Sequence, residues 1–280
     1  MTGLARSTFY YKSHPRLAQS ALDAILCERM QALALVFPRS GYRRMTAQLR
    51  REGFQVNHKR VLRLMRASNL LCQMKRRFVR TTDSGHDLPL YPNLSKELEL
   101  TKINQLWVAD ITYIHVREGF AYLAVLLDAF SRRVVGWALS RKIDSELTMT
   151  ALRAAVQARQ PPTGCIHHSD RGVQYAAAEY VELARHHRLR LSMSARANPY
   201  DNAKAESFFK TLKVEEIYLM EVVSVKELAA RLPYYIDEIY NEQRLHSSLG
   251  YLPPVEFEAL HTNSGPQAGD VLTTMQVCPV

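Results

Sequence analysis

Three segments rich in β-forming residues follow one another closely in the middle of the chain. They read LWVADITYIHV at 106–116, FAYLAVLLDAF at 120–130 and RRVVGWALS at 132–140. Connections this short favour antiparallel neighbours, because a parallel pair needs a long crossover. Two further strand patterns, at 165–170 and 189–194, alternate with helical patterns. This order predicts an α/β fold in which helices flank a mixed five-stranded sheet.

The helices expected around this sheet have identifiable starts. Asp144 or Ser145 is placed to cap the first of them. A second helix is expected at 175–187. A third is expected to begin near Pro199, because proline suits the first helical position and Asn198 can cap it.

Positive charge is concentrated in the first third of the chain. Residues 1–100 contain 18 Lys and Arg against 7 Asp and Glu, whereas residues 101–280 contain 19 against 20. A basic module on a near-neutral body favours a polyanionic partner such as nucleic acid. The alternative is a basic surface that serves only solubility.

The basic module is predicted to be an all-α helix-turn-helix domain. Helical patterns occur at 18–35, 42–52 and 58–70, with Gly53 ending the second and Asn57 capping the third. Two helices joined by about five residues that include Gly are typical of this motif. The apolar positions expected to face its core are Leu22, Ile25, Leu26, Met30, Leu33, Tyr42, Met45, Leu49, Val61, Leu62 and Met65.

The third helix of this module opens with cations, which the positive end of a helix dipole disfavours. Phosphate groups of a duplex would neutralise them, so DNA contact is the preferred interpretation and a solvated surface the alternative. The candidate DNA-binding residues of the module are Arg43, Arg44, Lys59, Arg60, Arg63, Arg66, Lys75, Arg76 and Arg77.

Composition divides the chain into five segments. They are a basic helical region at 1–80, a linker at 81–99, an α/β body at 100–215, a helical extension at 216–262 and a tail without periodicity at 263–280.

The cysteines and the apolar runs indicate a cytoplasmic protein. Cys27, Cys72, Cys165 and Cys278 are far apart and have no paired spacing, so they are expected to be reduced thiols. The chain contains no run of about 18 apolar residues, so no membrane span is expected. The first residues lack the apolar stretch of a secretory signal.

Three acidic residues occupy settings that suggest chemistry. Asp110 lies within a strand that is apolar on both sides, where a carboxylate is costly to bury without a cation. Asp170 ends a strand, where open sheets with parallel strands expose ligand sites. Glu206 shares one face of the last predicted helix with Lys210 and Lys213, since positions i, i+4 and i+7 form a stripe. The core-facing side of that helix is expected to be Ala205, Phe208, Phe209 and Leu212.

Convergence of these three acids would require divalent cations, because hard oxygen ligands would otherwise repel one another. Two cations would polarise a phosphodiester and activate the attacking oxygen, and the two lysines would hold a DNA strand beside them. Residue types alone leave this hypothesis open.

The spacing of these residues and five longer blocks resemble one known family. Asp110 and Asp170 are separated by 59 residues, Asp170 and Glu206 by 35, and Lys213 follows seven positions later. The blocks are WVADITYI, LLDAFSRRVVGWALS, HHSDRGVQY, SMSARANPYDNAKAESFFKTLK and YNEQRLHSSLGYLPP. Over about residues 1–260 the chain resembles the second-frame protein of the insertion-sequence-three family of DDE transposases, which are related to retroviral integrases.

One block departs from the family pattern. NPYDNAKAES stands where the family more often has Cys-Trp before Asp-Asn and Pro before Ala-Glu-Ser. Tyr200 still supplies an aromatic ring there, so altered packing around an intact acid is expected.

The resemblance implies an RNase H-like core at 100–215. It implies that Asp110, Asp170 and Glu206 are catalytic carboxylates holding two Mg²⁺ ions, with Mn²⁺ as a substitute, and that Lys213 touches the transposon end. The implied reaction is hydrolysis at a transposon end, followed by attack of the freed 3′-hydroxyl on another phosphodiester. The implied partners are double-stranded DNA of the terminal inverted repeats and the target, further copies of the chain, and the protein of an upstream frame.

Two other functions remain compatible with the residues. One is a DNA-binding regulator with an inactive core, and the other is a nuclease that never joins strands. The presence of all three acids in their blocks favours the enzyme.

The histidines invite two further interpretations. The motif HHSD suggests a Ser–His–Asp triad, but neighbouring residues on a strand point to opposite faces. His167, His168, His186 and His187 lack the spacing of a zinc site and are interpreted as structural or DNA-adjacent.

Other polar residues have competing roles. Asp128 is expected to cap the turn before Ser131 instead of acting as a catalytic acid. Asp201 is expected to lie at a helix start, near the positive end of the dipole. For Arg244 and His246, DNA contact and attachment of the terminal segment to the core are equally compatible.

Overall fold

The structure is a computed structural model that describes residues 16–72, 90–194, 202–220 and 223–263. The chain divides into two compact units, Met1–Phe78 and Val79–Val280. The predicted tail, apart from Asn263, and the basic residues Lys75, Arg76 and Arg77 lie outside the described residues.

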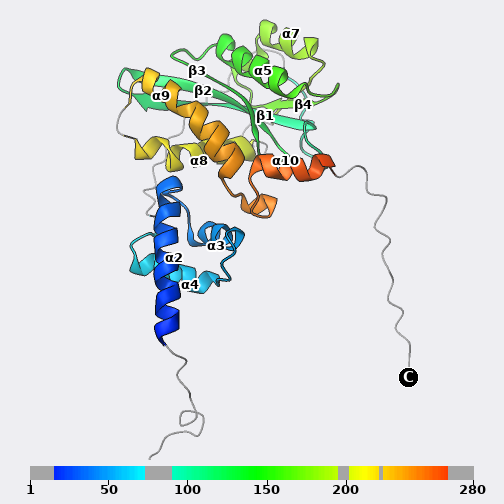
Figure 1. Ribbon diagram of the computed structural model, residues 1–280. Coiled ribbons are helices and arrows are strands. Elements are labelled where there is room, and N and C mark those ends of the chain that lie inside the picture. Colours follow the sequence, from blue (N-terminus) through cyan, green and yellow to red (C-terminus); the bar gives the residue numbers. More distant parts are fainter. Residues whose placement is uncertain (1–15, 73–89, 195–201, 221–222, 264–280) are drawn as a thin grey trace, which may run out of the picture. The chain divides into compact units, whose positions relative to one another are not determined.

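The first unit consists of three described helices, α2 (Arg16–Val36), α3 (Tyr42–Arg51) and α4 (His58–Ala67) (Figure 1). Gly53 ends the turn after α3 with a positive φ of 91°, which glycine adopts without steric cost. The side chain of Asn57 accepts a 2.9 Å hydrogen bond from the backbone N–H of Lys59, so its predicted capping role is confirmed. The buried core is Leu26, Met30, Leu33, Met45, Leu49, Val56, Val61, Leu64 and Met65.

Two residues expected in this core lie at the surface. Leu22 and Ile25 are 38% and 52% exposed, so their assignment to the buried stripe of α2 was wrong. Helical periodicity also fits the stripe that contains Leu26, Met30 and Leu33, and these three are the ones that pack against α3 and α4.

The second unit contains the predicted mixed sheet of five strands, in the order β3-β2-β1-β4-β5. The strands are β1 (Leu106–Val116), β2 (Gly119–Asp128), β3 (Val134–Ser140), β4 (Ile166–Ser169) and β5 (Arg190–Met193). β1, β2 and β3 pair antiparallel, as their short connections predict, whereas β4 pairs parallel with β1 and with β5. The predicted α/β class is therefore confirmed.

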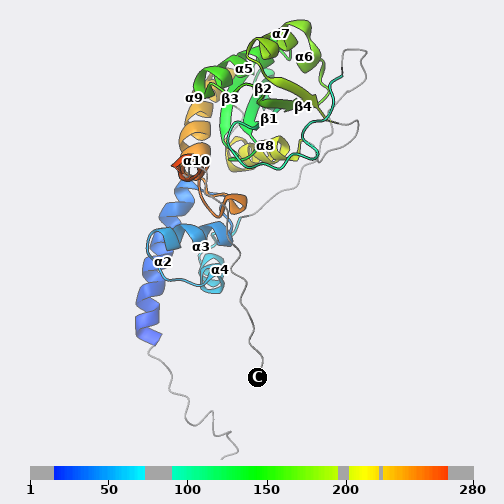
Figure 2. The ribbon, with the colours of Figure 1, turned by 90° about the vertical axis from the view of Figure 1, so that its right-hand side faces the viewer.

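Helices cover both faces of the sheet (Figures 1 and 2). One face carries α5 (Ser145–Arg159) and α7 (Ala178–His186), and the other carries α8 (Ala203–Glu215). α5 starts where predicted, because Asp144 caps it by accepting from Leu147 N–H at 3.1 Å. β3 lies so close to α5 that a Cβ on Gly136 would stand 2.5 Å from the carbonyl oxygen of Ala151.

The helix predicted at 175–187 is broken in two. α6 (Val173–Ala176) and α7 are separated by Ala177, whose ψ of 139° is extended. Local apolar periodicity continues through this break, so the sequence pattern did not reveal it.

The helix that carries Glu206 starts later than predicted. α8 begins at Ala203 with Asn202 at its N-cap position, so the assignment of Asn198 as the cap was wrong. Residues 195–201, which include Asn198, Pro199 and Asp201, lie outside the described residues. The predicted inner side of the helix is confirmed, since Ala205, Phe208, Phe209 and Leu212 are all buried.

A helical extension follows α8. It comprises η1 (Ile217–Leu219), α9 (Val225–Pro233), η2 (Tyr234–Gln243), η3 (Ser247–Leu249) and α10 (Pro254–Asn263). α9 runs directly into η2, which has wide π-type turns, and Pro233, which has no backbone N–H, lies at the junction.

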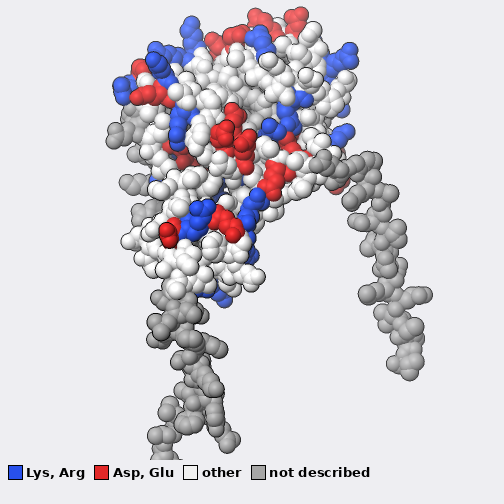
Figure 3. Space-filling view, in the orientation of Figure 1, with Lys and Arg blue, Asp and Glu red and all other residues white. Residues whose placement is uncertain are grey.

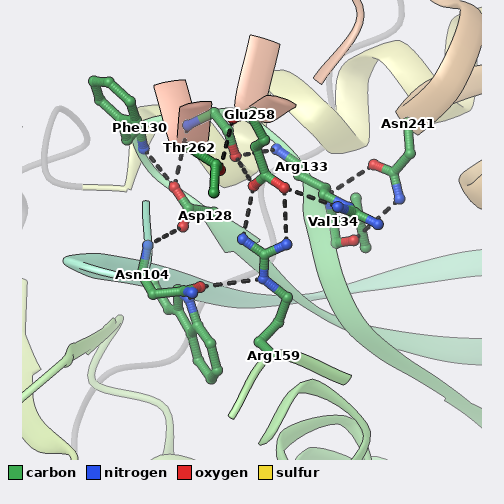
Figure 4. Close-up of polar contacts among 11 residues, drawn as sticks. Asn104, Asp128, Phe130, Arg133, Val134, Arg159, Asn241, Glu258 and Thr262 are labelled. Atoms are coloured by element: carbon green, nitrogen blue, oxygen red, sulfur yellow. Dashed lines mark hydrogen bonds and ion pairs between the residues drawn. The ribbon is translucent and has the colours of Figure 1, made fainter. Parts of the chain in front are cut away.

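Buried polar contacts attach this extension to the sheet (Figure 4). Asn241 of η2 pairs with both backbone groups of Val134, at 3.0 and 3.1 Å. Glu258 of α10 accepts two 2.8 Å hydrogen bonds from Arg159 and one from Arg133. These contacts lower the pKa of Glu258 against the effect of its burial, so the carboxylate stays charged within the protein.

No helix in the described part of the chain is both long and apolar enough to cross a lipid bilayer. Cys27, Cys72 and Cys165 are free thiols.

Candidate active site

Asp110 and Asp170 stand at the same level of two neighbouring strands. The parallel register pairs Trp107 with His167 and Val108 with His168. The same offset, continued two residues further, brings Asp170 beside Asp110, just past the end of β4. Equivalent positions of adjacent parallel strands are about 5 Å apart and point to the same face. Two carboxylates from distant parts of the chain are thereby brought together.

α8 brings the third acid to this pair. The amide Nδ2 of Asn202 donates to the carbonyl oxygen of Ala109 at 3.4 Å, which sets the start of α8 beside Asp110. Glu206 lies one turn further, and its side chain is exposed. Its negative charge reaches Asp110, where it raises the pKa.

Lys210 and Lys213 of α8 differ in their surroundings. Lys210 is exposed, whereas Lys213 is half-buried with its Nζ 4.9 Å from the ring centroid of Tyr113. Burial lowers the pKa of Lys213, and the charge of Asp110 opposes that shift. Lys213 therefore interacts with Asp110, one member of the acid pair.

The charge balance at Asp110 favours binding of a cation. Burial raises the pKa of Asp110 well above its usual value, and the charges of Asp170 and Glu206 raise it further. A 2.8 Å hydrogen bond from Ile111 N–H and the charge of Lys213 only partly compensate. Carboxylate oxygens are the donors that hard divalent cations prefer, so the residues present fit such an ion.

The three acids do not form a closed coordination group. Among the residues that the structure describes, no three His, Cys, Asp or Glu side chains stand close enough to hold a metal ion together. Asp110 and Asp170 are adjacent by register, and the charge of Glu206 acts on Asp110.

A buried tyrosine beside the acids was not singled out from the sequence. Tyr175 follows Asp170 on α6 and is 2% exposed, and its hydroxyl has no hydrogen-bond partner among the described residues. Burial raises the pKa of Tyr175 well above its usual value, with contributions from Tyr180, Asp110 and Asp170. Its sequence signal was its place in the block HHSDRGVQY.

The histidines next to Asp170 are structural. His167 is fully buried, and its Nε2 lies 2.8 Å from the hydroxyl of Tyr180. His168 is also buried, with its two ring nitrogens 2.8 Å from Ser192 Oγ and 3.1 Å from Ser194 Oγ. The His168 contacts hold β4 against β5, whereas the His167 contact joins β4 to α7. The Nδ1 of His167 is buried without a hydrogen-bond partner among the described residues.

Asp128 has the turn role predicted for it. Its Oδ1 accepts from the backbone N–H groups of Phe130 and Ser131 at 2.8 and 3.1 Å, and its Oδ2 accepts from Asn104 N–H at 2.6 Å (Figure 4). The side chain is fully buried, and burial raises its pKa against these three hydrogen bonds.

Arg244 attaches the terminal extension to the core. Its guanidinium donates to both carboxylate oxygens of Glu215, at 2.7 and 2.9 Å. His246 packs edge-on against Tyr240, with ring centroids 5.0 Å apart. Of the two roles left open for these residues, attachment is the one the contacts support.

The candidate DNA-binding residues of the helical unit differ in exposure. Arg43, Lys59, Arg63 and Arg66 are exposed, whereas Arg44 and Arg60 are half-buried. Asp23 of α2 accepts 2.7 Å bonds from both Arg60 and Arg63. Acidic and basic side chains accordingly stand side by side on the face of this unit seen in Figure 3.

Known families match the chain in three places. Residues 101–199 and 187–254 match two families described as Integrase core domain, and residues 21–78 match one described as HTH-like domain.

Several curated proteins are similar over most of the chain. The transposase InsF for insertion sequence IS3A of Escherichia coli (strain K12) is 40% identical over 221 residues, which cover 79% of this chain and 77% of that protein. InsF for insertion sequence IS3fB of the same strain is 37% identical over 260 residues, 91% and 90% of the two chains. An uncharacterized 31 kDa protein of insertion element IS600 from Shigella sonnei is 41% identical over 218 residues, 78% and 80%.

Two solved structures align with the chain at low sequence identity. The simian T-cell lymphotropic virus intasome with the PP2A regulatory subunit B56 gamma aligns with a TM-score of 0.49 at 16% identity, over 86% of this chain and 76% of that chain. The HTLV-2 integrase catalytic core domain in complex with magnesium aligns with a TM-score of 0.44 at 15% identity, over 56% and 97%.

The mixed sheet, the acid pair on its parallel strands and the family matches define a protein with an integrase core preceded by an HTH-like domain. The identity with the InsF proteins narrows this class: the chain belongs to the IS3 family of insertion-sequence transposases. The resemblance found in the sequence is confirmed.

Proposed function

We propose that this protein is a DDE transposase that cleaves DNA at transposon ends and joins the freed 3′-hydroxyl to another phosphodiester. The observation that carries the proposal is that the parallel register of β1 and β4 brings Asp170, just past the end of β4, beside Asp110, with the charge of Glu206 acting on Asp110. The relatives that are named transposases support the reaction class.

Asp110, Asp170 and Glu206 would hold two divalent cations, Mg²⁺ or in its place Mn²⁺. When bound, the cations polarise the scissile phosphate and activate an oxygen nucleophile, either water or a 3′-hydroxyl. Burial and the charges of Asp170 and Glu206 raise the pKa of Asp110, so a bound cation would stabilise the charged form of this carboxylate. Glu206, which is exposed at the less tightly held end of α8, would complete the ligand set by moving toward the aspartates.

Lys213 is proposed to contact the transposon end. It is held half-buried against Tyr113 and so presents its ammonium group near Asp110 at a fixed place. Lys210, exposed one turn before it, would follow the DNA backbone as a solvated cation.

The helical unit is proposed to bind double-stranded DNA of the terminal inverted repeats. Its exposed cations, Arg43, Lys59, Arg63 and Arg66, are the candidates for phosphate contact. We also propose phosphate contact for Lys75, Arg76 and Arg77, on the basis of the sequence alone. Joining two transposon ends requires that both ends are bound, so a homo-oligomer on DNA is proposed. The upstream-frame protein of the same element is proposed as a further partner.

Substitution of Asp110 by Asn tests the reaction. We expect the full-length variant to lose cleavage and strand transfer by at least about a thousandfold while DNA affinity stays within about twofold, because one carboxylate is removed and the helical unit is untouched. Asp144→Asn is the matched control, since Asn caps a helix as well as Asp does. Unchanged cleavage in the Asp110 variant would refute the assignment.

A pre-cut end separates the transposase from a nuclease. An oligonucleotide that already carries the free 3′-hydroxyl is offered to the wild-type protein with Mg²⁺ and target DNA. Joined product is expected. Cleavage of an uncut end without any joining of the pre-cut end would identify a nuclease instead.

A further inference from the structure

The two ends of α8 are attached to the protein very differently. At the start, Asn202 makes a single long hydrogen bond of 3.4 Å to Ala109, and the Oδ1 of the same amide is buried with no partner in the described part of the chain. At the other end, Glu215 receives two short hydrogen bonds from Arg244. The firmly attached end is therefore the one remote from Glu206.

The contact between Arg244 and Glu215 is a buried bidentate ion pair. The two side chains are 12% and 14% exposed. Burial by itself would lower the pKa of Arg244, but the hydrogen bonds and charge of Glu215 raise it overall. Such a pair fixes geometry, because a planar guanidinium meets both carboxylate oxygens in one orientation only.

Aromatic packing supports the same end of the extension. The guanidinium of Arg244 lies 5.8 Å from the ring centroid of Tyr240, and Tyr240 packs edge-on against Phe208 of α8 at 4.8 Å. Arg231 of α9 donates one hydrogen bond, from its Nε, to Glu216, the residue that follows α8. Both carboxylates at the end of α8 thus take an arginine from the extension.

Arg244 holds α8 at the end that is remote from Glu206. Glu215 follows Glu206 by nine positions, which corresponds to about two and a half turns and about 13 Å along the axis. A helix is stiff over this length, so a rotation or a shift at Glu215 is passed on to Glu206 and Lys213. The distance of Glu206 and Lys213 from Asp110 therefore depends on how α8 is held at Glu215.

We propose that Arg244 is a positioning residue which, through Glu215, sets the rotation and axial position of α8 and so aims Glu206 and Lys213 at the Asp110–Asp170 pair. This inference rests on the proposed function, because the position of α8 matters for cation binding only if Glu206 is a ligand together with the two aspartates. The loosely attached start of α8 moves toward the aspartates, and the end at Arg244 stays in place.

The test compares Mn²⁺ binding to the full-length protein by titration calorimetry in three forms. Arg244→Gln removes the ion pair on α8. Glu258→Gln is the matched control, because it breaks an ion pair of similar burial with Arg159 and Arg133 in the same unit without touching α8 (Figure 4). We expect both variants to unfold at lower temperature, but only the Arg244 variant to bind Mn²⁺ more weakly, by about tenfold.

Two further measurements separate positioning from folding. The exchanged pair Arg244→Glu with Glu215→Arg is expected to recover most of the Mn²⁺ affinity. Amide hydrogen exchange across 203–215 is expected to be faster in Arg244→Gln than in Glu258→Gln. If Arg244→Gln does not fold, Arg244→Lys keeps the charge, loses the bidentate geometry, and is expected to weaken Mn²⁺ binding in the same direction.

The Mn²⁺ titrations can contradict the role of Arg244 and the proposed transposase function separately. Equal Mn²⁺ affinity in the wild type and the Arg244 variant would overturn the inference, as would an equal loss in Glu258→Gln. A wild-type protein whose Mn²⁺ binding does not depend on Asp110 would overturn the proposed function itself.

Discussion

The backbone N–H of Gly172 donates a 2.9 Å hydrogen bond to Oδ1 of Asp170, and a Cβ on this glycine would stand 2.9 Å from the same oxygen. The φ of Gly172 is −63°, which any residue adopts, so the constraint at this position is space and not backbone conformation. Gly172 therefore lets the main chain hold the Asp170 carboxylate at close range.

Gly172→Ala is expected to displace the Asp170 carboxylate. The added methyl group would also meet Gln174 Oε1 at 3.0 Å, so one of the two side chains must move. We expect Mn²⁺ affinity and strand cleavage to fall by about tenfold, and the free energy of unfolding to change by less than about 1 kcal/mol, because helix propensity is not at stake outside the helix. Gly41→Ala is the control, since nothing lies within 4 Å of its Cβ position. Full activity of Gly172→Ala would show that Asp170 tolerates the shift.

Asp110→Asn is expected to stabilise the metal-free protein at neutral pH. The pKa of Asp110 is raised on folding, so its contribution to stability is present below the unfolded value of 3.8 and is lost as pH rises through the higher folded pKa. A neutral Asn avoids that loss. We expect the variant to gain about 1 kcal/mol at pH 7, or about 2–4 °C in Tm, and to gain nothing near pH 3.5.

Urea unfolding at the two pH values measures this difference. Glu182→Gln, at an exposed position, serves as the control and is expected to change stability at neither pH. An Asp110→Asn variant less stable than the wild type at pH 7 would mean that the buried charge is already compensated.

His167 is expected to make the protein acid-sensitive between about pH 6.5 and 4. Burial lowers the pKa of His167 from 6.5 to about 4. Within this window His167 is protonated in the unfolded chain but stays neutral in the folded protein. The free energy of unfolding therefore falls as pH falls, by up to about 1.4 kcal/mol per pH unit. His167→Gln keeps an acceptor for the Tyr180 hydroxyl and is expected to reduce this slope in denaturant titrations.

The exposed His261 provides the comparison for that experiment. His261→Gln changes a histidine at an exposed position and serves as the control variant. An unchanged slope in His167→Gln would assign the acid sensitivity to other groups.

Two neighbouring cations of the helical unit are expected to behave differently toward DNA. Lys59 is exposed, whereas Arg60 is half-buried and bonded to Asp23 at 2.7 Å. Lys59→Ala should weaken DNA binding and reduce the slope of log K against log salt by about 1, with stability unchanged. Arg60→Ala should change that slope less and lower the free energy of unfolding of the unit. Equal slopes would mean that Arg60 leaves Asp23 when DNA binds.

The elements of the fold were largely predictable, because their signals are local. The five strands and the caps Asn57 and Asp144 follow from alternation, turn residues and hydrogen-bonding side chains within a few positions. The errors occurred where a local pattern fits two outcomes. Leu22 and Ile25 satisfy helical periodicity and yet lie outside, and the pattern at 175–187 does not show the break at Ala177.

The amino-acid sequence by itself singled out Asp110, Asp170 and Glu206 as the candidate catalytic acids, because their order, spacing and surrounding blocks are features of the chain itself. Tertiary structure alone decided which of them lie side by side. The parallel register of β1 and β4 aligns Asp110 with Asp170, and the extension supplies Arg244 to hold α8. Contacts of this kind join distant residues, as when Ser131 donates to Glu258 across 127 positions. Such pairs depend on packing geometry, which no local period of 2 or 3.6 residues encodes.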